Sequence, residues 1–324
     1  MNKTASKKYI GRLLFSQPVV LFAFIVIIGI ITSSVNAKFM TWTNISSIIS
    51  QSASLGLVAA GMTILIISGH FDISVGNMIG FTTCVMAMLI NKGIDSFLAS
   101  IFAIILCVLC SLINGGMSII FKAPSFIVTL ATSSLYYGIA LILTKGYMQT
   151  LYGKYRFLAS YKIFGIFPFL FLVLFAGFLV VYLMMKHTRT GREMFAIGTN
   201  VNAAYLSGIN VKFSKLKFFV LSGVLVGFAC MVLLSRISGA QATTGMGMEL
   251  QAIGAVVIGG SSINGGKGGV VGTLFGVILL SMISNAINML RISAYYQDIV
   301  YALVILIALA ITALRNVMLE RQEN

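Results

Sequence analysis

The chain has 324 residues, of which 59% are hydrophobic and 9% charged, and its mean hydropathy is +1.02. Soluble globular domains usually carry about 25% charged residues, so the composition excludes a soluble globule and indicates a polytopic membrane protein. The net charge of +15 does not indicate a nucleic-acid partner, because the basic residues lie between apolar runs rather than along one face.

The apolar runs predict the transmembrane helices, because a bilayer core of about 30 Å needs about 20 apolar residues per helix. Ten runs fit, in chain order: 18–35, 48–68, 75–91, 97–120, 126–144, 163–185, 215–235, 250–263, 270–290 and 296–315. The first run exceeds the usual 7–15 residues of a signal-peptide core, so we expect a retained span. The eighth is short and rich in glycine, which indicates a broken or re-entrant element. We therefore expect an all-α fold with a single transmembrane domain, 1–324.

The basic residues predict the orientation of the spans. With the amino terminus in the cytoplasm and ten crossings, 14 of the 22 basic residues lie on the cytoplasmic side. Positive charge is enriched in cytoplasmic loops, so this orientation is favoured and both termini are expected in the cytoplasm.

One long polar interval, 186–217, separates the sixth and seventh spans. Thr190 and Glu193 have the spacing of a capping box, which predicts a short helix that ends at Gly198. Asn200 is expected to cap a second short helix, which Gly208 ends. Spacing alone is equally consistent with a basic connector that only fixes topology. Two capped helices with small residues between positive flanks favour a surface that docks on a soluble partner.

Polar side chains inside apolar spans are costly and need an explanation. Asp72, in the polar break 68–76, either caps the next helix through its amino-terminal dipole or belongs to a gate. Uncharged amides and hydroxyls on the spans suit a pathway for a neutral, polyhydroxylated solute, and they also suit hydrogen bonding between helices. The candidate pathway or gate residues are Asp72, Ser74, Asn114, Phe126, Thr129, Glu249 and Asn285.

Catalytic and cofactor motifs are missing from the sequence. It contains no H-E-x-x-H or G-x-S-x-G motif, and Gly265-Gly266-Lys267-Gly268 lacks the flanking residues of a phosphate loop. Four cysteines, Cys84, Cys107, Cys110 and Cys230, all lie inside apolar segments and are interpreted as core residues. We expect no enzymatic activity, no cofactor and no metal. Because the phosphate-loop pattern is incomplete, any transport driven by ATP would need a second chain to bind the nucleotide.

Several ordered motifs resemble the ribose-type sugar permeases of ABC importers. SGHFDISVG at 68–76 is similar to the family's S-G-G-I-D-L-S-V-G signature, with His70-Phe71 replacing the usual Gly-Ile. Asn114-Gly115, PSFIVTLAT at 124–132, the loop 190–211 and ELQAIGAVVIGGSS at 249–262 continue the resemblance over most of residues 45–310.

This resemblance implies a bacterial inner-membrane importer with the larger, ten-helix fold of ABC importer permeases. It implies ABC ATPase subunits, a second permease that is a copy or a homologue, and an external solute-binding protein as partners, within the lipid bilayer. Loop 187–214 would contact the ATPase through Gly191, Arg192, Glu193, Ala196, Gly198, Asn200, Ala203, Ala204 and Gly208. The expected solute is a monosaccharide or a similar small neutral polyol, carried by ATP-driven alternating access.

Two other functions fit the same sequence. Branched-chain amino-acid permeases of ABC importers are related, although Asp72-Ile73-Ser74-Val75-Gly76 favours sugars. An ion-driven secondary carrier would use Asp72, Glu249 or Asp298 to take up a proton or Na⁺. An intramembrane enzyme is disfavoured by the missing motifs.

Overall fold

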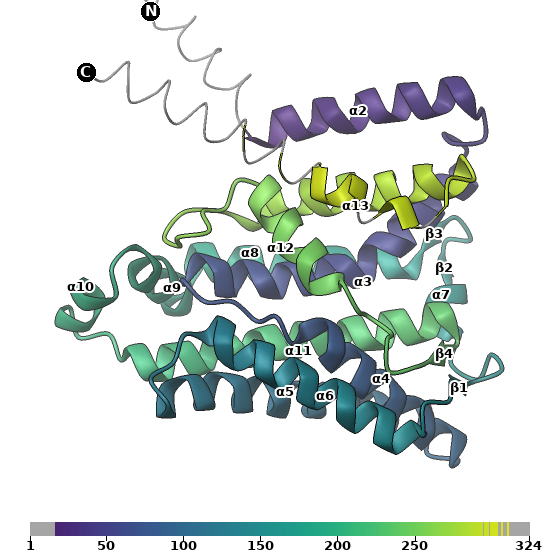
Figure 1. Ribbon diagram of the computed structural model, residues 1–324. Helices are drawn as coiled ribbons and strands as arrows, with labels where there is room; N and C mark the ends of the chain where they lie inside the picture. The colour runs from purple at the N-terminus through teal and green to yellow at the C-terminus, as the bar shows by residue number, and fades with distance from the viewer. Residues whose placement is uncertain (1–16, 294, 298, 304–305, 307–309, 311–324) are drawn as a thin grey trace, which may run out of the picture.

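The computed structural model describes residues 17–293, 295–297, 299–303, 306 and 310, and these residues are almost entirely helical (Figure 1). The helices are α2 (Gln17–Val35), α3 (Trp42–Ile67), α4 (Val75–Asn91), α5 (Ser96–Ile120), α6 (Ser125–Thr144), α7 (Phe157–Ser160), α8 (Phe169–His187), α9 (Arg189–Thr199), α10 (Val201–Leu206), α11 (Val211–Ile237), α12 (Met248–Ile258) and α13 (Val270–Met289). This confirms the all-α membrane fold. Each of the first nine expected spans overlaps a helix, whereas the tenth, 296–315, falls largely outside the described residues.

Six of the described helices are long and apolar enough to cross a membrane: α3, α5, α6, α8, α11 and α13. Shorter apolar helices are found within Gln17–Val35, at α4 and at α12. The shortness of α12 agrees with the broken element expected there, because an extended segment and two glycines with positive φ, Gly245 and Gly247, precede it.

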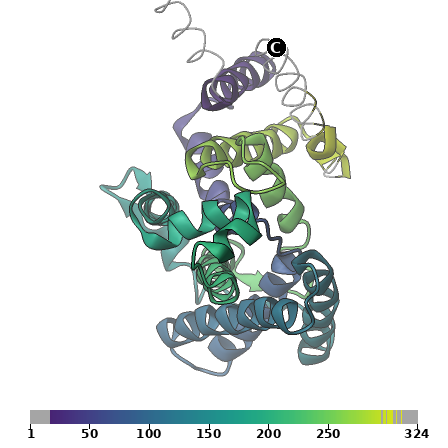
Figure 2. The ribbon, with the colours of Figure 1, turned by 90° about the vertical axis from the view of Figure 1, so that its left-hand side faces the viewer.

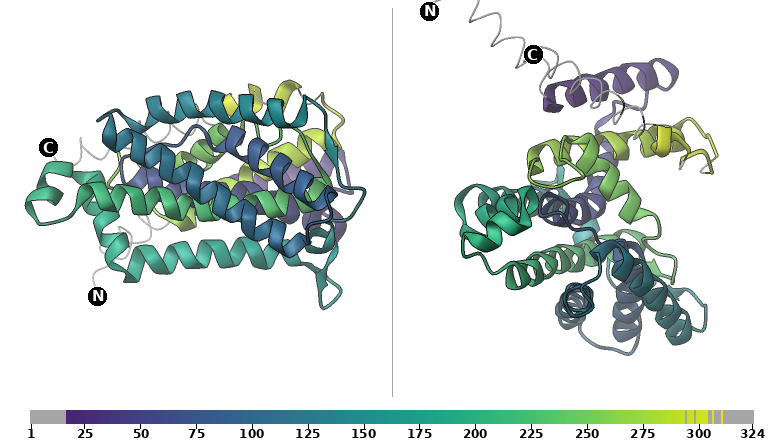
Figure 3. Two further views of the ribbon diagram at one scale, coloured as in Figure 1. Left: turned by 90° about the horizontal axis from the view of Figure 1, so that it is seen from below. Right: turned by 60° about the vertical axis from the view of Figure 1, so that its left-hand side comes forward.

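The two ends of the bundle differ in structure. At one end β1 (Gln149–Thr150) pairs with β4 (Gly239–Ala240) and β2 (Lys162–Ile163) with β3 (Phe167–Pro168), both antiparallel. At the opposite end, α9 and α10 extend beyond α8 and α11, as Figures 1 and 3 show. We call these the strand end and the α9–α10 end.

Helix α3 forms the centre of the bundle and is buried along most of its length. It packs against α8, α11, α12 and α13. Viewed from the α9–α10 end (Figure 2), α2 and α13 lie on one side of α3, and α4, α5 and α6 lie on the other. Small residues allow this packing, because a Cβ at Gly61 would lie 2.8 Å from Ser222 Oγ of α11.

Glycines at spacings of four bring other helix pairs into close contact. A Cβ at Gly223 would lie 2.9 Å from the Cys107 carbonyl oxygen of α5, and Gly227 would be equally crowded by Ile104. Gly272 and Gly276 similarly face the α12 backbone. The G-x-x-x-G spacing of these glycines predicts close helix packing, and the structure confirms it.

Phe39 and Trp42, at the end of the first span, are predicted from the sequence to lie in the aromatic belt at the membrane interface, and only one of them agrees. Phe39 is completely buried, with Ile48 and Met282, because the chain turns back there between α2 and α3. Trp42 is exposed as expected; its indole nitrogen donates a hydrogen bond to the Ile166 carbonyl oxygen (3.3 Å).

Candidate functional site

Loop 187–214 forms two short helices, as the sequence predicted, but its first cap differs. Thr188, not Thr190, caps α9, because its hydroxyl accepts a hydrogen bond from the Gly191 amide (3.2 Å). The helix continues through Gly198 to Thr199, so Gly198 does not end it. The second helix agrees with the prediction: the Asn200 side chain accepts from the Ala203 amide (3.0 Å), and Gly208 adopts a φ of +82° after α10.

The carboxylate of Glu193 joins α9 to α11 instead of capping α9. Lys217 Nζ donates to its Oε2 at 2.8 Å and Ser214 Oγ donates to the same oxygen at 2.9 Å. Arg189 Nε donates to Oε1 at 2.8 Å. Burial of the Glu193 carboxylate raises its pKa. The hydrogen bonds from Lys217 and Ser214 and the positive charge of Lys217 lower the pKa by more than burial raises it, so it lies below the ordinary 4.5.

This pairing stabilises the loop only while Glu193 is ionised. Because the pKa is lower in the folded chain, the stabilisation is present above the unfolded value of 4.5 and is lost as pH falls through the lowered pKa. We expect Glu193→Gln to reproduce that loss at pH 7 and to speed hydrogen exchange of the α9 amides about tenfold. The matched control is Arg192→Gln on the exposed face of α9. Equal exchange in both variants would contradict the pairing role.

Glycines bring α9 into direct contact with two interhelical connections. A Cβ at Gly198 would come within van der Waals overlap of the Ile67 carbonyl oxygen at the end of α3, and within 2.6 Å of the Gly266 nitrogen. Gly266 N itself donates to the Ile67 carbonyl at 2.8 Å. Gly265 lies against Gly69 and Gly198. The structure therefore joins α9, the end of α3 and the α12–α13 connection; we call these three segments the glycine junction.

The outward face of loop 187–214 combines apolar and basic groups. Leu206 is 84% exposed and Tyr205 is 70% exposed; both belong to α10, which lies at the outer edge of the α9–α10 end. Between α9 and α10 lies an open cavity of about 370 Å³. Its lining residues are Phe195, Ala196, Thr199, Asn200, Ala203, Ala204, Ser207 and Ile209.

The expected loop residues divide between this face and the interior. Arg192, Asn200, Ala203 and Gly208 are exposed, whereas Gly191, Glu193 and Ala204 are buried and Ala196 and Gly198 are partly buried. Tyr205 and Leu206 were missed. Their position between small residues, Ala203-Ala204 before them and Ser207-Gly208 after them, was the available signal.

The candidate pathway residues Asp72, Ser74 and Asn114 form one buried network. Asn114 Nδ2 donates to Asp72 Oδ2 (3.2 Å) and to Ser74 Oγ (2.8 Å), and the Ser74 amide donates to Asp72 Oδ1 (3.0 Å). The Tyr136 hydroxyl donates to Asn114 Oδ1 (3.0 Å). Asp72 and Asn114 are completely buried. The N-cap residue of α4 is Ser74, not Asp72. Asp72 accepts a hydrogen bond from the Ser74 amide and ties the 68–74 break to α5 through Asn114.

Of the other candidate pathway residues, Thr129 contacts the same break beside that network, and Asn285 lies elsewhere. Thr129 is buried and its hydroxyl accepts from the Ile73 amide (3.1 Å), whereas Phe126 is half exposed. Asn285 exchanges two hydrogen bonds with Asn44, of 2.8 and 3.0 Å, and joins α13 to α3. Asp298 lies outside the described residues.

Glu249 lies at the start of α12, against the first turn of α4. Its Oε1 accepts from the Gly247 amide (3.3 Å), and its buried Oε2 lies beside Gly76. Any Cβ at Gly76 would overlap that oxygen. The structure thus brings the two interrupted elements, 68–76 and 239–249, together.

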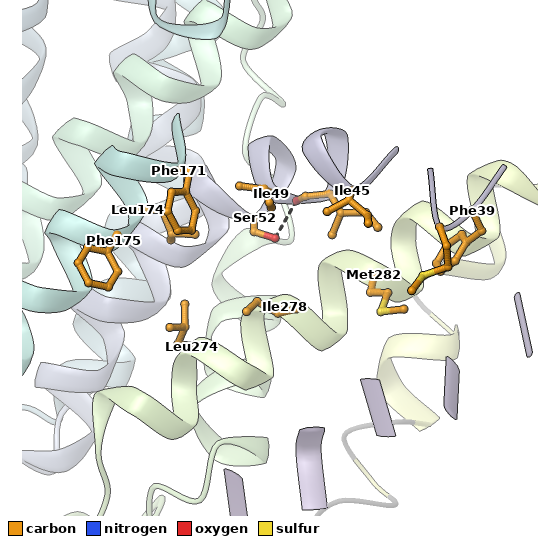
Figure 4. A pocket seen from close by; sticks show the side chains of 12 residues that line it. Phe39, Ile45, Ile49, Ser52, Phe171, Leu174, Phe175, Leu274, Ile278 and Met282 are labelled. Atoms are coloured by element: carbon orange, nitrogen blue, oxygen red, sulfur yellow. Dashed lines mark hydrogen bonds between the residues drawn. The ribbon is translucent and has the colours of Figure 1, made fainter. Parts of the chain in front are cut away.

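A separate pocket lies between α3, α8 and α13, towards the strand end (Figure 4). Its volume is about 250 Å³, and Phe171, Leu174 and Ile278 are among the apolar side chains that line it. The single polar side chain in the lining, Ser52, donates to the Ile48 carbonyl oxygen (2.8 Å). The pocket therefore suits an acyl chain better than a polar solute.

Within the described part of the chain, no three His, Cys, Asp or Glu side chains gather in a way that could hold a metal ion. All four cysteines are buried and none forms a disulfide, which confirms their interpretation as core residues; the thiols of Cys107 and Cys230 share a hydrogen bond (Sγ–Sγ 3.8 Å).

Apolar spans, interrupted helices with buried polar groups and a structured surface at one end together define a multi-pass membrane transport protein. Residues 44–309 match the family described as "Branched-chain amino acid transport system / permease component", and the chain belongs to this family. Ribose import permease protein RbsC of Bacillus subtilis (strain 168) is 40% identical over 286 residues, which cover 87% of this chain and 88% of that protein.

Two further relatives cover nearly the whole chain. Ribose import permease protein RbsC of Haemophilus influenzae (strain ATCC 51907 / DSM 11121 / KW20 / Rd) is 36% identical over 313 residues, covering 95% of this chain and 96% of its own. D-allose transport system permease protein AlsC of Escherichia coli (strain K12) is 32% identical over 319 residues, covering 97% of each chain. No solved structure matches the chain.

Proposed function

We propose that this chain is the membrane-spanning permease of a bacterial sugar importer driven by ATP hydrolysis on a partner subunit. It supplies the passage and the contact surface, and it performs no chemistry. Permeases named for ribose and allose support a monosaccharide as solute. The glycine junction carries the proposal, because a force applied to α9 reaches the end of α3 and the α12–α13 connection through backbone contacts.

The α9–α10 end faces the cytoplasm in this proposal, with both termini on the same side. Lys186, Arg189, Arg192 and Lys212 support this placement, because positive charge accumulates in cytoplasmic loops. The ATPase binds the outward face of loop 187–214, and an external solute-binding protein delivers the sugar at the strand end. A second permease, either a copy or a homologue, completes the transporter in the inner membrane.

The passage follows the two interrupted elements and opens by alternating access. Nucleotide-driven movement of α9 shifts α3 and the α12–α13 connection, and the network of Asp72, Ser74 and Asn114 acts as the gate. Thr129, Phe126 and Glu249 belong to the same passage, and Asn285 holds α13 to α3 while it opens. The described network carries no ion pair, which suits a neutral solute.

Loop docking is tested with Leu206→Glu, which places a charge on the most exposed apolar side chain of α10. We expect the amount of ATPase that copurifies with the permease to fall about tenfold or more, because buried apolar anchors dominate such interfaces. Phe164→Glu at the strand end is the control, since Phe164 is 93% exposed there. Full ATPase recovery with Leu206→Glu would reject the docking surface.

Transport itself is measured by uptake of ribose, allose and leucine into vesicles that contain the permease, its ATPase and its binding protein. ATP-dependent uptake of a sugar is expected. Leucine uptake alone would support an amino-acid permease, as the family description suggests. Uptake driven by an ion gradient without the ATPase would support a secondary carrier.

A further inference from the structure

Among the described residues, two non-helical segments that interrupt the helices meet on α4. The first is the non-helical segment before α4, and the second is the segment between β4 and α12. A Cβ at Gly80 would overlap the Ala242 carbonyl oxygen, just as Gly76 faces Glu249. Non-helical backbone in a membrane is tolerated where protein buries it or where it lines a water-filled cavity, and interrupted spans mark solute sites in transporters.

Two side chains at this meeting point have acceptor oxygens without a donor. Asn77 directs its amide nitrogen to Ser133 Oγ (2.9 Å), but its Oδ1 is buried and unpaired. Glu249 Oε2 is likewise buried and unpaired, and it lies against Gly76, which precedes Asn77 in α4. Unpaired buried acceptors are unfavourable, so both oxygens favour a hydroxyl donor from outside the chain.

An aromatic surface lies one turn further along α4. Phe81 is partly exposed and stacks on Tyr136, with ring centroids 6.1 Å apart and planes at 9°. Tyr136 is fixed by its hydrogen bond to Asn114, so the Phe81 ring has a defined orientation. A rigid aromatic surface near two acceptors matches a sugar ring, which has an apolar C–H face and hydroxyl donors at its edge.

We propose that Asn77, Phe81 and Glu249 contact the sugar ring during its passage, with Asn77 and Glu249 accepting hydroxyl hydrogen bonds and Phe81 packing against the ring. This inference rests on the proposed sugar transport. Asp72, Ser74 and Asn114 are not included in this contact set, because their polar atoms are already hydrogen-bonded to one another in the gate network.

The test measures solute access directly in the assembled transporter. Asn77→Cys is labelled with N-ethylmaleimide during ATP-driven turnover, with and without saturating ribose. We expect ribose to slow labelling about fivefold or more, as a bound ring shields the thiol. The buried native cysteines give a low background, which the unsubstituted permease measures.

Uptake by side-chain variants provides the second measurement. Asn77→Leu and Phe81→Leu are expected to lower ribose uptake about five- to tenfold while the ATPase still copurifies. The control is Phe275→Leu, a partly buried phenylalanine whose ring contacts Phe22 of α2. Ribose uptake with no protection of Asn77→Cys, or unchanged uptake by both variants, would overturn the inference. If the unsubstituted transporter takes up no sugar at all, the proposed function itself fails.

Discussion

Gly198→Ala is expected to abolish most uptake while the permease still inserts in the membrane. The added methyl group would overlap the Ile67 carbonyl oxygen and press on the Gly266 nitrogen. Both are backbone atoms that no side-chain rotation can remove, so α9 must move away from the glycine junction. Overpacking of this kind destabilises a protein by about 1–3 kcal/mol. Here we expect it to disrupt the contact between α9 and the glycine junction while the rest of the fold stays intact. Uptake per folded transporter is the measurement.

Gly138→Ala is the matched control for this variant. Gly138 lies inside α6 and has no atom within 4 Å of an added Cβ, so alanine there should leave uptake unchanged. Copurification of the ATPase separates two explanations for a loss. If Gly198→Ala keeps its ATPase and loses uptake, the junction transmits movement; normal uptake would show that α9 moves independently of α3.

The sequence predicted the span boundaries well where a polar or glycine-rich segment both ends the apolar run and ends the helix. Val75–Asn91 and Val270–Met289 begin where predicted, because polar or glycine-rich segments precede both helices. Helix α3 begins earlier than expected, at Trp42, because the helix extends into residues 42–47, whose polar side chains kept them out of the apolar run. Helix α12 ends at Ile258, before the predicted 263, and Gly260 then has a φ of +91°.

The functional site was less predictable, because its decisive contacts join residues that are distant in sequence. Thr190 and Glu193 have the spacing of a capping box, yet the Glu193 carboxylate instead accepts hydrogen bonds from Lys217 and Ser214 of α11. Gly198 was expected as a helix stop, whereas its role is contact with Ile67. No local spacing contains such information, since each contact depends on how helices pack.

The polar segments 67–76 and 259–268 are both rich in glycine and serine and both lie between two spans, but the sequence alone does not show why. In the structure one part of each segment meets the other beside α9, where Gly266 N donates to the Ile67 carbonyl oxygen. Gly265 and Gly266 lie beside α9, whereas Gly76 lies against Glu249 and Gly259 lies against Gly272, so the shared composition serves different contacts. Residue types alone could not predict these contacts, because each depends on how the helices pack.

Asn114→Leu is expected to lower the free energy of unfolding by about 1–3 kcal/mol, because Asp72 Oδ2 loses its donor inside a completely buried network. Leucine has a similar volume, so the loss of the amide is the main change. Thermal unfolding in detergent measures it. In a double-mutant cycle, Asp72→Asn and Asn114→Leu should be less than additive, since each removes the same hydrogen bond.

The same variant tests whether this network is the gate. A loss of about 1–3 kcal/mol from the closed arrangement changes its population relative to the open one by roughly 5- to 150-fold. Uptake normalised to folded transporter should therefore fall at least fivefold, because alternating access requires closure on each cycle. Reduced stability with unchanged uptake would instead assign Asp72 and Asn114 a purely structural role, in which they hold the break before α4 against α5 while the sugar passes elsewhere.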